Sequence, residues 1–299
     1  MESGRHYGMD WLRIGAFLGS RSGRLLLPLL FGIAVIVPPQ SWVELTTQHG
    51  YGHGYLHFWT HDYFRFGKVH DIVLPTWNHL WFVAYLWTYT MLLGLLFVLP
   101  ARARQWLAAM VERALAGPRI IVVPLALLYL RQALHWPGAD ETHELINDWH
   151  AHEVYFGLFL LGFLLARSDV LWLAIRRWWR LAAVLAIVGY AVVAALNILY
   201  LAGVRWDFWG PLTSDIFRDV QGWNAIIALI GIADRYWNRD HPWRATLNEA
   251  VFPFYVIHQT VIVVVAYWLV GRRVTPLRPF IGLRLTRKPA TREAVPAAG

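Results

Sequence analysis

The sequence contains no cysteine, which excludes disulfide bonds, thiolate nucleophiles and cysteine-bound metal centres. Charged residues are also scarce: Asp, Glu, Lys and Arg make up 15% of the 299 residues, whereas soluble domains carry about 25%. The first residues, M-E-S-G-R-H-Y-G-M-D-W-L-R, lack the basic start and long apolar core of a cleaved signal peptide. A soluble or thiolate-dependent protein is therefore not expected, and the apolar segments themselves would direct membrane insertion.

Apolar and aromatic residues dominate what is present. Hydrophobic residues make up 57% of the chain, with 18 Trp and 13 Tyr. In Trp77–Pro100, twenty uncharged residues run from Leu80 to Leu99, and at ~1.5 Å per residue they span the roughly 30 Å of a bilayer core. Trp and Tyr favour the membrane–water interface. The sequence therefore predicts an all-α fold, a polytopic transmembrane helical bundle.

Seven spans are predicted along the chain. Pro38-Pro39 is expected to end the first helix near Val37 and leave a short or tilted span. Residues Gln40–Thr76 read as a loop, and Ala101–Arg119 as an amphipathic helix. Residues 1–271 would form one membrane domain, and the basic tail at 272–299 is predicted to be disordered. The predicted spans are Leu25–Val43, Trp77–Pro100, Ile120–Trp136, Asp148–Ala166, Leu181–Val204, Phe217–Ala233 and Ala250–Gly271.

Arginine, which supplies 25 of the 27 basic residues, predicts the orientation. Segments 1–24, 101–119, 167–180 and 235–249 hold four, four, four and three Arg, while loops 40–76, 137–150 and 204–218 hold two, none and two Lys or Arg. By the positive-inside rule the first set is cytoplasmic, so the net charge of +8 needs no nucleic-acid partner. Seven spans would place the basic tail outside, which conflicts with the positive-inside rule. Either a span is miscounted, or the tail does not belong with the rest of the membrane domain.

Polar groups near or inside spans are functional candidates because burying them in lipid is costly. His79 lies at the mouth of the second span, as a general base or as an interfacial histidine bonded to a neighbour. The seventh span carries Glu249, Tyr255, His258 and Gln259 in its first half. These groups could supply a base or could be helix-packing hydrogen bonds, and Pro253 is expected to kink the helix beside them.

Two histidine-rich stretches lie on the predicted outer side. His150, His152 and Glu153 open the fourth span in D-W-H-A-H-E-V-Y-F, as a polar cavity lining or as a solvated helix start, and no H-E-x-x-H motif is present. His49, His53, His57 and His61 repeat every four residues, but Gly50, Gly52 and Gly54 disfavour a helix there. Loop histidines are the expectation, and no metal site is predicted.

Arg21 and Arg24 precede the first span. Two arginines three residues apart share one side of a helix and can grip a phosphate bidentately. Ordinary positive-inside flanking explains them equally well.

Five sequence blocks resemble one family. The blocks are Y-G-M-D-W-L-R-I-G-A-F (Tyr7–Phe17), S-G-R-L-L-L-P-L-L-F-G (Ser22–Gly32), P-P-Q (Pro38–Gln40), N-H-L-W-F-V-A-Y-L (Asn78–Leu86) and L-N-E-A-V-F-P-F-Y-V-I-H-Q-T (Leu247–Thr260). Over about residues 7–270 the chain resembles the membrane acyltransferase 3 family, most closely its periplasmic-glucan succinyltransferase branch. The resemblance implies a multi-pass protein of the bacterial inner membrane that moves an acetyl or succinyl type of group from cytoplasmic acyl-CoA to a carbohydrate hydroxyl outside.

The resemblance also implies roles for individual residues. Arg13 matches the arginine that opens the family's Arg-x10-His motif, and Arg21 and Arg24 match an Arg-x-x-Arg pair suited to the phosphates of the CoA donor. His79, Glu249 and His258 match polar positions of later helices, from which the catalytic groups would come. Membrane lipid, acyl-CoA and a glucan or other carbohydrate are the implied partners, with no bound cofactor.

The chain departs from the family pattern at two places. Eleven residues after Arg13 stands Arg24 instead of the motif's histidine, as if most of a first helix and all of a second were missing near residue 17. After V-G-R-R-V-T-P-L, an Arg- and Pro-rich tail follows where one more span is expected. A non-catalytic, truncated membrane remnant of the family is therefore one alternative to an enzyme. A small-molecule transporter is the other, although the inverted repeats typical of transporters are not evident.

Overall fold

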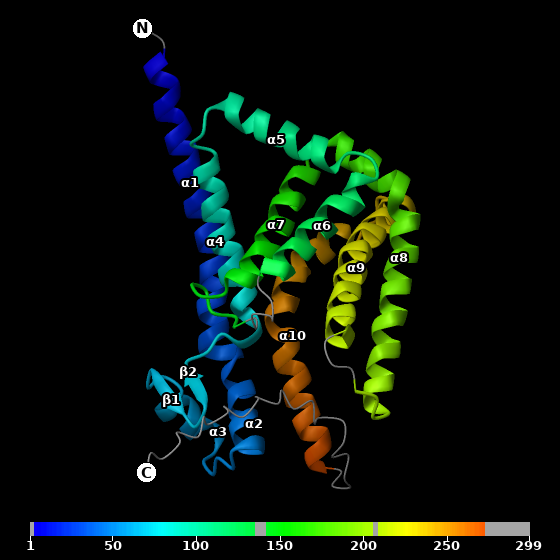
Figure 1. Ribbon diagram of the computed structural model, residues 1–299. Coiled ribbons are helices and arrows are strands. Elements are labelled where there is room, and N and C mark those ends of the chain that lie inside the picture. Colours follow the sequence, from blue (N-terminus) through cyan, green and yellow to red (C-terminus); the bar gives the residue numbers. More distant parts are fainter. Residues whose placement is uncertain (1–2, 135–141, 206–208, 273–299) are drawn as a thin grey trace, which may run out of the picture.

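The computed structural model describes residues 3–134, 142–205 and 209–272, with side chains of residues 3–14, 209 and 271–272 left aside. The described chain is a bundle of long helices with a small cap at one end (Figure 1). Its elements are α1 (Ser3–Phe31), η1 (Gly32–Ile36), α2 (Pro38–Gln48), α3 (Tyr55–His57), η2 (Phe58–Asp62), β1 (Gly67–Val69), β2 (Ile72–Leu74), η3 (Asn78–Leu80), α4 (Trp81–Leu96), α5 (Ala101–Leu115), α6 (Arg119–Leu134), α7 (Trp149–Leu165), α8 (Asp169–Leu201), α9 (Trp209–Ile232), η4 (Ala233–Trp237) and α10 (Arg244–Arg272).

Five helical stretches in the described part of the chain are long and apolar enough to cross a membrane: Gly15–Gln48, Asn78–Leu96, Asp169–Leu201, Gly210–Trp237 and Arg244–Val270. The pair α5 and α6, bent by 98°, makes six if it counts as one span, and α7 is a shorter apolar helix. Each predicted span thus falls on a helix, and the all-α polytopic membrane fold is confirmed.

The first span differs from its prediction. Helix α1 does not start at Leu25 but runs unbroken from Ser3 to Phe31, and its helical path continues through the π-helix η1 into α2. Pro38 and Pro39 do interrupt the helix, but they also occupy the first turn of α2. Proline is tolerated there because the missing N–H would have no intrahelical acceptor. The proline pair therefore joins two helices instead of ending the span in a loop.

Residues 40–76 form a folded cap, not the predicted loop. Helix α2 covers its start, and β1 and β2 pair antiparallel with Lys68 opposite Val73. A buried cluster holds the cap together and consists of Leu45, Phe58, Tyr63 and Leu74. The prediction failed because the glycines at 50, 52 and 54 do break the helix, but only between α2 and α3.

The π-helix η1 fastens the cap to the bundle. A π turn is wider than an α turn and typically marks a special position in a helix. Its carbonyl groups accept hydrogen bonds from the cap: Tyr63 Oη donates to Ile33 O at 2.7 Å, and Trp59 Nε1 donates to Ala34 O at 2.9 Å. The cap is thus bonded directly to the backbone of the first span.

Helices α8 and α9 pack along their length beside the rest of the bundle (Figure 1). Gly189 allows this close approach, because a Cβ atom at that position would lie 3.0 Å from the backbone oxygen of Phe217. The core of this half includes Ile120, Ile175 and Ile227. Helix α8 also begins earlier than the predicted Leu181, since Ser168 caps its start by accepting a hydrogen bond from Leu171 N at 3.3 Å.

The arginine-rich segments gather at one end of the bundle. Figure 1 shows α5, the junction of α7 with α8, and η4 at the end opposite the cap. This end is called the basic end below, and the other end the cap end. The arrangement of these three segments therefore agrees with the alternation of arginine counts, whereas Arg21 and Arg24 lie inside the stretch Gly15–Gln48 that is long enough to span a membrane.

Candidate functional site

His79 occupies the junction between the cap end, α4 and α10. Its Nε2 lies 2.9 Å from the carbonyl oxygen of Val256, and its Nδ1 lies 3.4 Å from Nε2 of Gln40. A carbonyl only accepts, so Nε2 of His79 must donate, and this assigns the neutral ring's lone pair to Nδ1. The imidazole is therefore oriented with a proton acceptor toward Gln40.

Gln40, the first polar residue after the proline pair, is buried and central to the site. Its Oε1 accepts a hydrogen bond of 3.4 Å from Asn78 Nδ2, and its Nε2 donates to Thr260 Oγ1. Thr260 in turn donates to Ile36 O at 2.8 Å. This polar chain joins α2, η3, α10 and η1, so the position of the His79 ring depends on four elements at once.

Tyr255 and His258 reach the same place from α10. The Tyr255 hydroxyl donates to the backbone carbonyl of His79, and the His258 ring stands perpendicular to the His79 ring at a centroid distance of 5.4 Å. His258 Nδ1 lies 2.6 Å from Tyr255 O, so Nδ1 donates and the lone pair of the neutral ring lies on Nε2. The structure thus brings the predicted site residues His79, Tyr255 and His258 together, and α10 holds the His79 backbone.

A close approach fixes η3 against the first span. Gly32 is buried in η1, and a Cβ atom there would overlap the side chain of Leu80. A larger residue at position 32 would therefore displace the Leu80 side chain, which directly follows His79. The local packing sets the depth of His79 relative to α1.

The site opens into a cavity of about 1600 Å³ at the cap end, called the outer cavity below. Its polar lining comes from α2, η3 and α10, and its aromatic lining includes Trp81 and Trp268. Among its described lining residues the charged side chains are Glu44 and Glu144, with no Lys or Arg. This chemistry suits an uncharged, hydroxyl-rich ligand better than a phosphorylated one. The polar lining residues are Gln40, Glu44, Thr47, Gln48, Thr76, Asn78, His79, Thr142, His143, Glu144 and Gln259.

One rim of the outer cavity is the turn before α7. Its His143 stacks on Trp81 at a centroid distance of 4.5 Å. Buried Asp148 holds the turn in place by accepting hydrogen bonds from His143 N at 2.9 Å and from Tyr85 Oη at 2.8 Å. His152 supports the same turn, since its Nε2 lies 2.9 Å from Leu145 O.

The remaining candidates around α7 lie away from the outer cavity. His150 Nε2 lies 2.8 Å from Arg131 Nη1, and Tyr89 Oη lies 2.9 Å from His152 Nδ1. Glu153 lines a second cavity between α4 and α7, described below. Of the residues predicted to line the substrate site, Gln259 lines the outer cavity, whereas His150, His152, Glu153 and Tyr255 do not appear among its lining residues.

The predicted donor and acid residues are not brought to His79. Arg21 and Arg24 are exposed on α1, and Glu249 is exposed on α10. Arg21 stacks on Phe17, with its Cζ 5.5 Å from the ring centroid. The Arg13 side chain lies outside the described residues. Ser22, between the two arginines, accepts a hydrogen bond of 3.0 Å from Trp87, so the pair lies about eight residues up α4 from His79, or roughly 12 Å.

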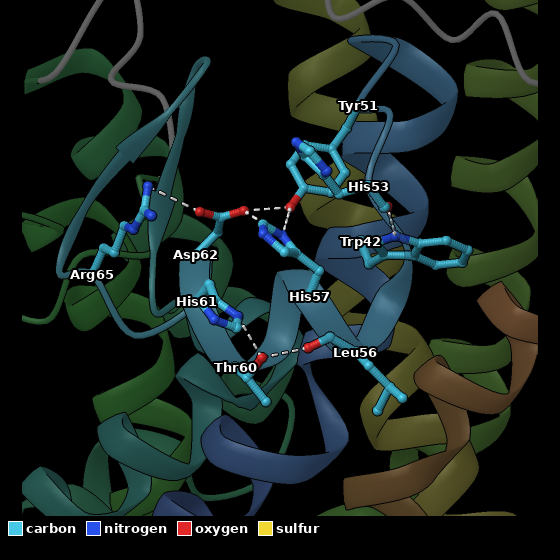
Figure 2. Close-up of polar contacts among 9 residues, drawn as sticks. All are labelled: Trp42, Tyr51, His53, Leu56, His57, Thr60, His61, Asp62 and Arg65. Carbon is cyan, nitrogen blue, oxygen red and sulfur yellow. Dashed lines mark hydrogen bonds and ion pairs between the residues drawn. The ribbon is translucent and has the colours of Figure 1, made fainter.

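The histidines of the cap form a row in which His53, His57 and His61 stack with centroids 4.4 Å and 4.7 Å apart. Figure 2 shows this row beside Tyr51, Asp62 and Arg65. Nitrogen lone pairs lie in the plane of each imidazole, so stacked rings cannot direct them at one ion. No group of three or more His, Asp or Glu side chains in the described part of the chain is arranged to hold a metal.

Asp62 links the histidine row to Tyr51 and Arg65 of the cap. It accepts a hydrogen bond from Tyr51 and forms an ion pair of 3.0 Å with Arg65. The Tyr51 hydrogen bond, helped by Arg65 and the nearby histidines, lowers the pKa of Asp62 below its usual value. Burial, together with the Asp62 carboxylate, raises the pKa of Tyr51 to about 12. Asp62 is therefore ionised and Tyr51 neutral over the physiological range.

Sequence reasoning missed Gln40, Thr260 and His143 as parts of the site. Gln40 and Thr260 both lie within the blocks P-P-Q and Leu247–Thr260 that resembled the family, so those blocks contained the signal. His143 has a positive φ of 55° and lies in a turn, where no periodic pattern identifies it.

Comparison with known proteins supports the family resemblance seen in the sequence. No curated protein and no solved structure matches it. The family described as an acyltransferase domain, Acyl_transf_3, matches residues 3–285, which includes the cap, η1 and all the helices that surround His79. The chain therefore belongs to the acyltransferase 3 family of membrane acyltransferases.

Proposed function

We propose that this protein moves an acetyl or succinyl type of acyl group from cytoplasmic acyl-CoA to a hydroxyl group of a cell-envelope carbohydrate at the bacterial inner membrane. The observation that carries the proposal is the setting of His79. Its lone pair lies on Nδ1, beside Gln40, in the wall of a cavity whose described lining has hydroxyl, amide and aromatic groups but no Lys or Arg.

In the proposed reaction His79 is the general base. The acceptor hydroxyl takes the place of the Gln40 amide at Nδ1, and its proton passes to Nδ1 as its oxygen bonds to the thioester carbonyl carbon. The C–S bond then breaks, and the imidazolium returns the proton to the CoA thiolate. The Val256 carbonyl holds Nε2–H throughout, which keeps the correct tautomer in place. His258 supports the ring instead of contacting the acceptor, because it does not appear in the cavity lining.

The donor would approach from the basic end. Arg21 and Arg24 are the proposed phosphate-binding pair, and the pantetheine arm would follow α1 over the roughly 12 Å that separate this pair from His79. The acyl carbonyl would thereby reach His79 while the phosphates stay at the Arg21–Arg24 pair, beside Trp87 of α4.

A non-catalytic remnant of the family is the second candidate. The observation that favours it is the exposure of Arg21, Arg24 and Glu249, which line neither the outer cavity nor the second cavity between α4 and α7. A donor site built only from side chains that no cavity encloses would make few contacts with acyl-CoA and would bind it weakly.

Thiol release from acyl-CoA by the reconstituted protein tests the proposal. Since the chain has no cysteine, its own side chains do not react with the thiol reagent. We expect turnover with acetyl-CoA or succinyl-CoA and a glucan acceptor, a loss with His79→Gln, and a raised KM for acyl-CoA with Arg21→Gln/Arg24→Gln. Arg239→Gln, at an exposed arginine outside both cavities, is the control. A folded, inserted wild-type chain without turnover would instead support the remnant.

A further inference from the structure

A second large cavity lies between α4, α5, α6, α7 and α9, and it also measures about 1600 Å³. It is called the leucine cavity below, because its walls are mainly leucine side chains such as Leu96, Leu127 and Leu161. Pockets for small ligands measure roughly 300–1,000 Å³, so this space is large enough for a lipid. The proposed reaction does not use it.

Two arginines lie at the basic end of the leucine cavity. Arg104 lies over the ring of Phe97 at 5.1 Å, and Arg167 lies over the ring of Phe163 at 4.9 Å. The two phenyl rings touch, with centroids 6.0 Å apart. Arg104 donates one hydrogen bond to Phe97 O at 3.3 Å, and neither guanidinium has an ion-pair partner among the described residues. Each guanidinium carries five N–H donors, so most remain free for an anion.

The apolar part of the cavity is deep enough for one leaflet of a bilayer. Between Glu153 and Arg167 the chain has thirteen uncharged residues, about 20 Å along the axis of α7. Half of the roughly 30 Å hydrocarbon core is about 15 Å. The lining becomes polar at Glu153, and Arg131, Arg218 and Asp219 are the other charged residues there. The leucine-lined part is thus long enough for the acyl chains of the leaflet at the basic end.

Helix α5 closes this space from the basic end. It is amphipathic, lies at 98° to α6, and crosses the top of the bundle in Figure 1. Its apolar side faces the cavity with Leu107 and Val111, while Trp106 is 59% exposed. A basic amphipathic helix with an exposed Trp is typical of segments that lie in the membrane interface. Glu112 also lines the cavity, but it follows Arg104 by eight residues, or roughly 12 Å along α5.

We propose that the leucine cavity is a binding site for one anionic phospholipid of the leaflet at the basic end. Its phosphate lies between Arg104 and Arg167, where charge-assisted hydrogen bonds favour phosphate oxygens. Its acyl chains lie against the leucines of α4 and α7. Zwitterionic lipid carries a compensating positive charge, so the two arginines favour the anionic class.

Lipid retention after reconstitution tests this site without requiring catalysis. The full chain is placed in nanodiscs of equal phosphatidylglycerol and phosphatidylcholine, extracted into mild detergent, and analysed for bound lipid by native mass spectrometry. We expect the wild type to retain about one phosphatidylglycerol per chain. Arg104→Gln/Arg167→Gln should reduce this retention at least about tenfold. The control variant Arg102→Gln/Arg113→Gln also removes two positive charges, but from α5 residues outside the cavity lining. It should leave phosphatidylglycerol retention unchanged.

A cavity-filling pair covers the case in which the double arginine variant fails to fold. Gly157 lines the cavity and has open space around the position of a Cβ atom, so Gly157→Trp fills the cavity without backbone strain. Gly162, on the same helix with equally open surroundings, is outside the lining, and Gly162→Trp is the matched control. We expect only Gly157→Trp to lose the lipid.

Three results would overturn the assignment. Equal retention of both lipids would show a crevice without anion selectivity. Retention that survives both Gly157→Trp and the double arginine variant would place the lipid elsewhere. Displacement of the lipid by acyl-CoA at stoichiometric concentration would identify the donor as the occupant. Failure of the proposed acyl transfer changes none of these readouts, because lipid is counted directly.

Discussion

The outer cavity and the leucine cavity have the same size, about 1600 Å³, and opposite chemistry. The outer cavity has amide, hydroxyl and carboxylate groups and no described Lys or Arg. The leucine cavity has an apolar middle, with Arg104 and Arg167 at its basic end and further charged side chains, among them Arg131 and Arg218, elsewhere in its lining. Cavity volume therefore does not indicate which cavity would bind the substrate and which would bind a lipid. The positions of the charged side chains do, and the following experiments test this difference between the two cavities.

The largest expected effect is at His79. His79→Ala removes the proposed base and should reduce acyl transfer by about 10²–10⁴-fold, the usual contribution of general base catalysis. His61→Ala is the control, because His61 is an exposed cap histidine outside both cavities. Transfer rates with a fixed acceptor make the comparison. Equal rates for the two variants would remove His79, and with it the outer cavity, from the chemistry.

Filling the outer cavity gives the converse of Gly157→Trp. Ala266 lines the outer cavity, so Ala266→Trp should raise the KM for the carbohydrate acceptor about tenfold, equivalent to 1.4 kcal/mol of binding. It should leave phosphatidylglycerol retention unchanged, and Gly157→Trp should leave the acceptor KM unchanged. If each substitution alters both readouts, the two cavities are not independent sites.

The wall of the outer cavity also depends on the cap. Tyr63→Phe removes the hydroxyl that donates to Ile33 O at 2.7 Å and to Thr76 O at 3.1 Å. We expect a loss of about 1 kcal/mol in stability, typical of one net hydrogen bond, measured as a lower Tm in nanodiscs. Tyr236→Phe, at a side chain 49% exposed, should have no effect. A lowered Tm without any change at the outer cavity would separate cap stability from the site.

The smallest expected effect is a pH dependence confined to the cap. The pKa of Asp62 is lower in the folded chain than in the unfolded one, so its stabilising contribution is complete above the unfolded pKa of about 3.9 and lost as pH falls through the folded pKa. The protection factors of residues 55–65, which compare amide exchange rates with the intrinsic rates at the same pH, should therefore fall in acid. The Asp62→Asn protein should lack this dependence, and α7 beside the leucine cavity should show no such response in either protein.

Long apolar runs made most of the bundle predictable. Each predicted span falls on a helix, and the polar groups His79, Tyr255 and His258 were found because they interrupt such runs. The polar chain through Gln40 was not predictable, because a glutamine after two prolines resembles a loop until α2 is seen to start there. The hydrogen bonds that define its role come from elements up to 224 residues apart.

Glu249 shows where helical spacing misled. Six residues on an α-helix amount to about 600°, which leaves Glu249 some 120° away from Tyr255 around the axis. His258, three residues further, returns to within about 60° of Tyr255. The structure accordingly exposes Glu249 and brings the other two to His79. Arg21 and Arg24 are both exposed on α1, and their predicted role as a phosphate-binding pair stays a prediction.

The π-helix η1 is hydrogen-bonded both to the cap and to the site around His79, so the cap is not an independent module. Its carbonyl groups at Ile33 and Ala34 are bonded to the cap, and its Ile36 carbonyl is bonded to Thr260, the partner of Gln40 beside His79. A cap transplanted from a relative would have to supply the same donors to the same turn, or free carbonyls would remain next to the site. Exchange of acceptor specificity between such proteins would therefore require the cap and the π turn to be moved together as one unit.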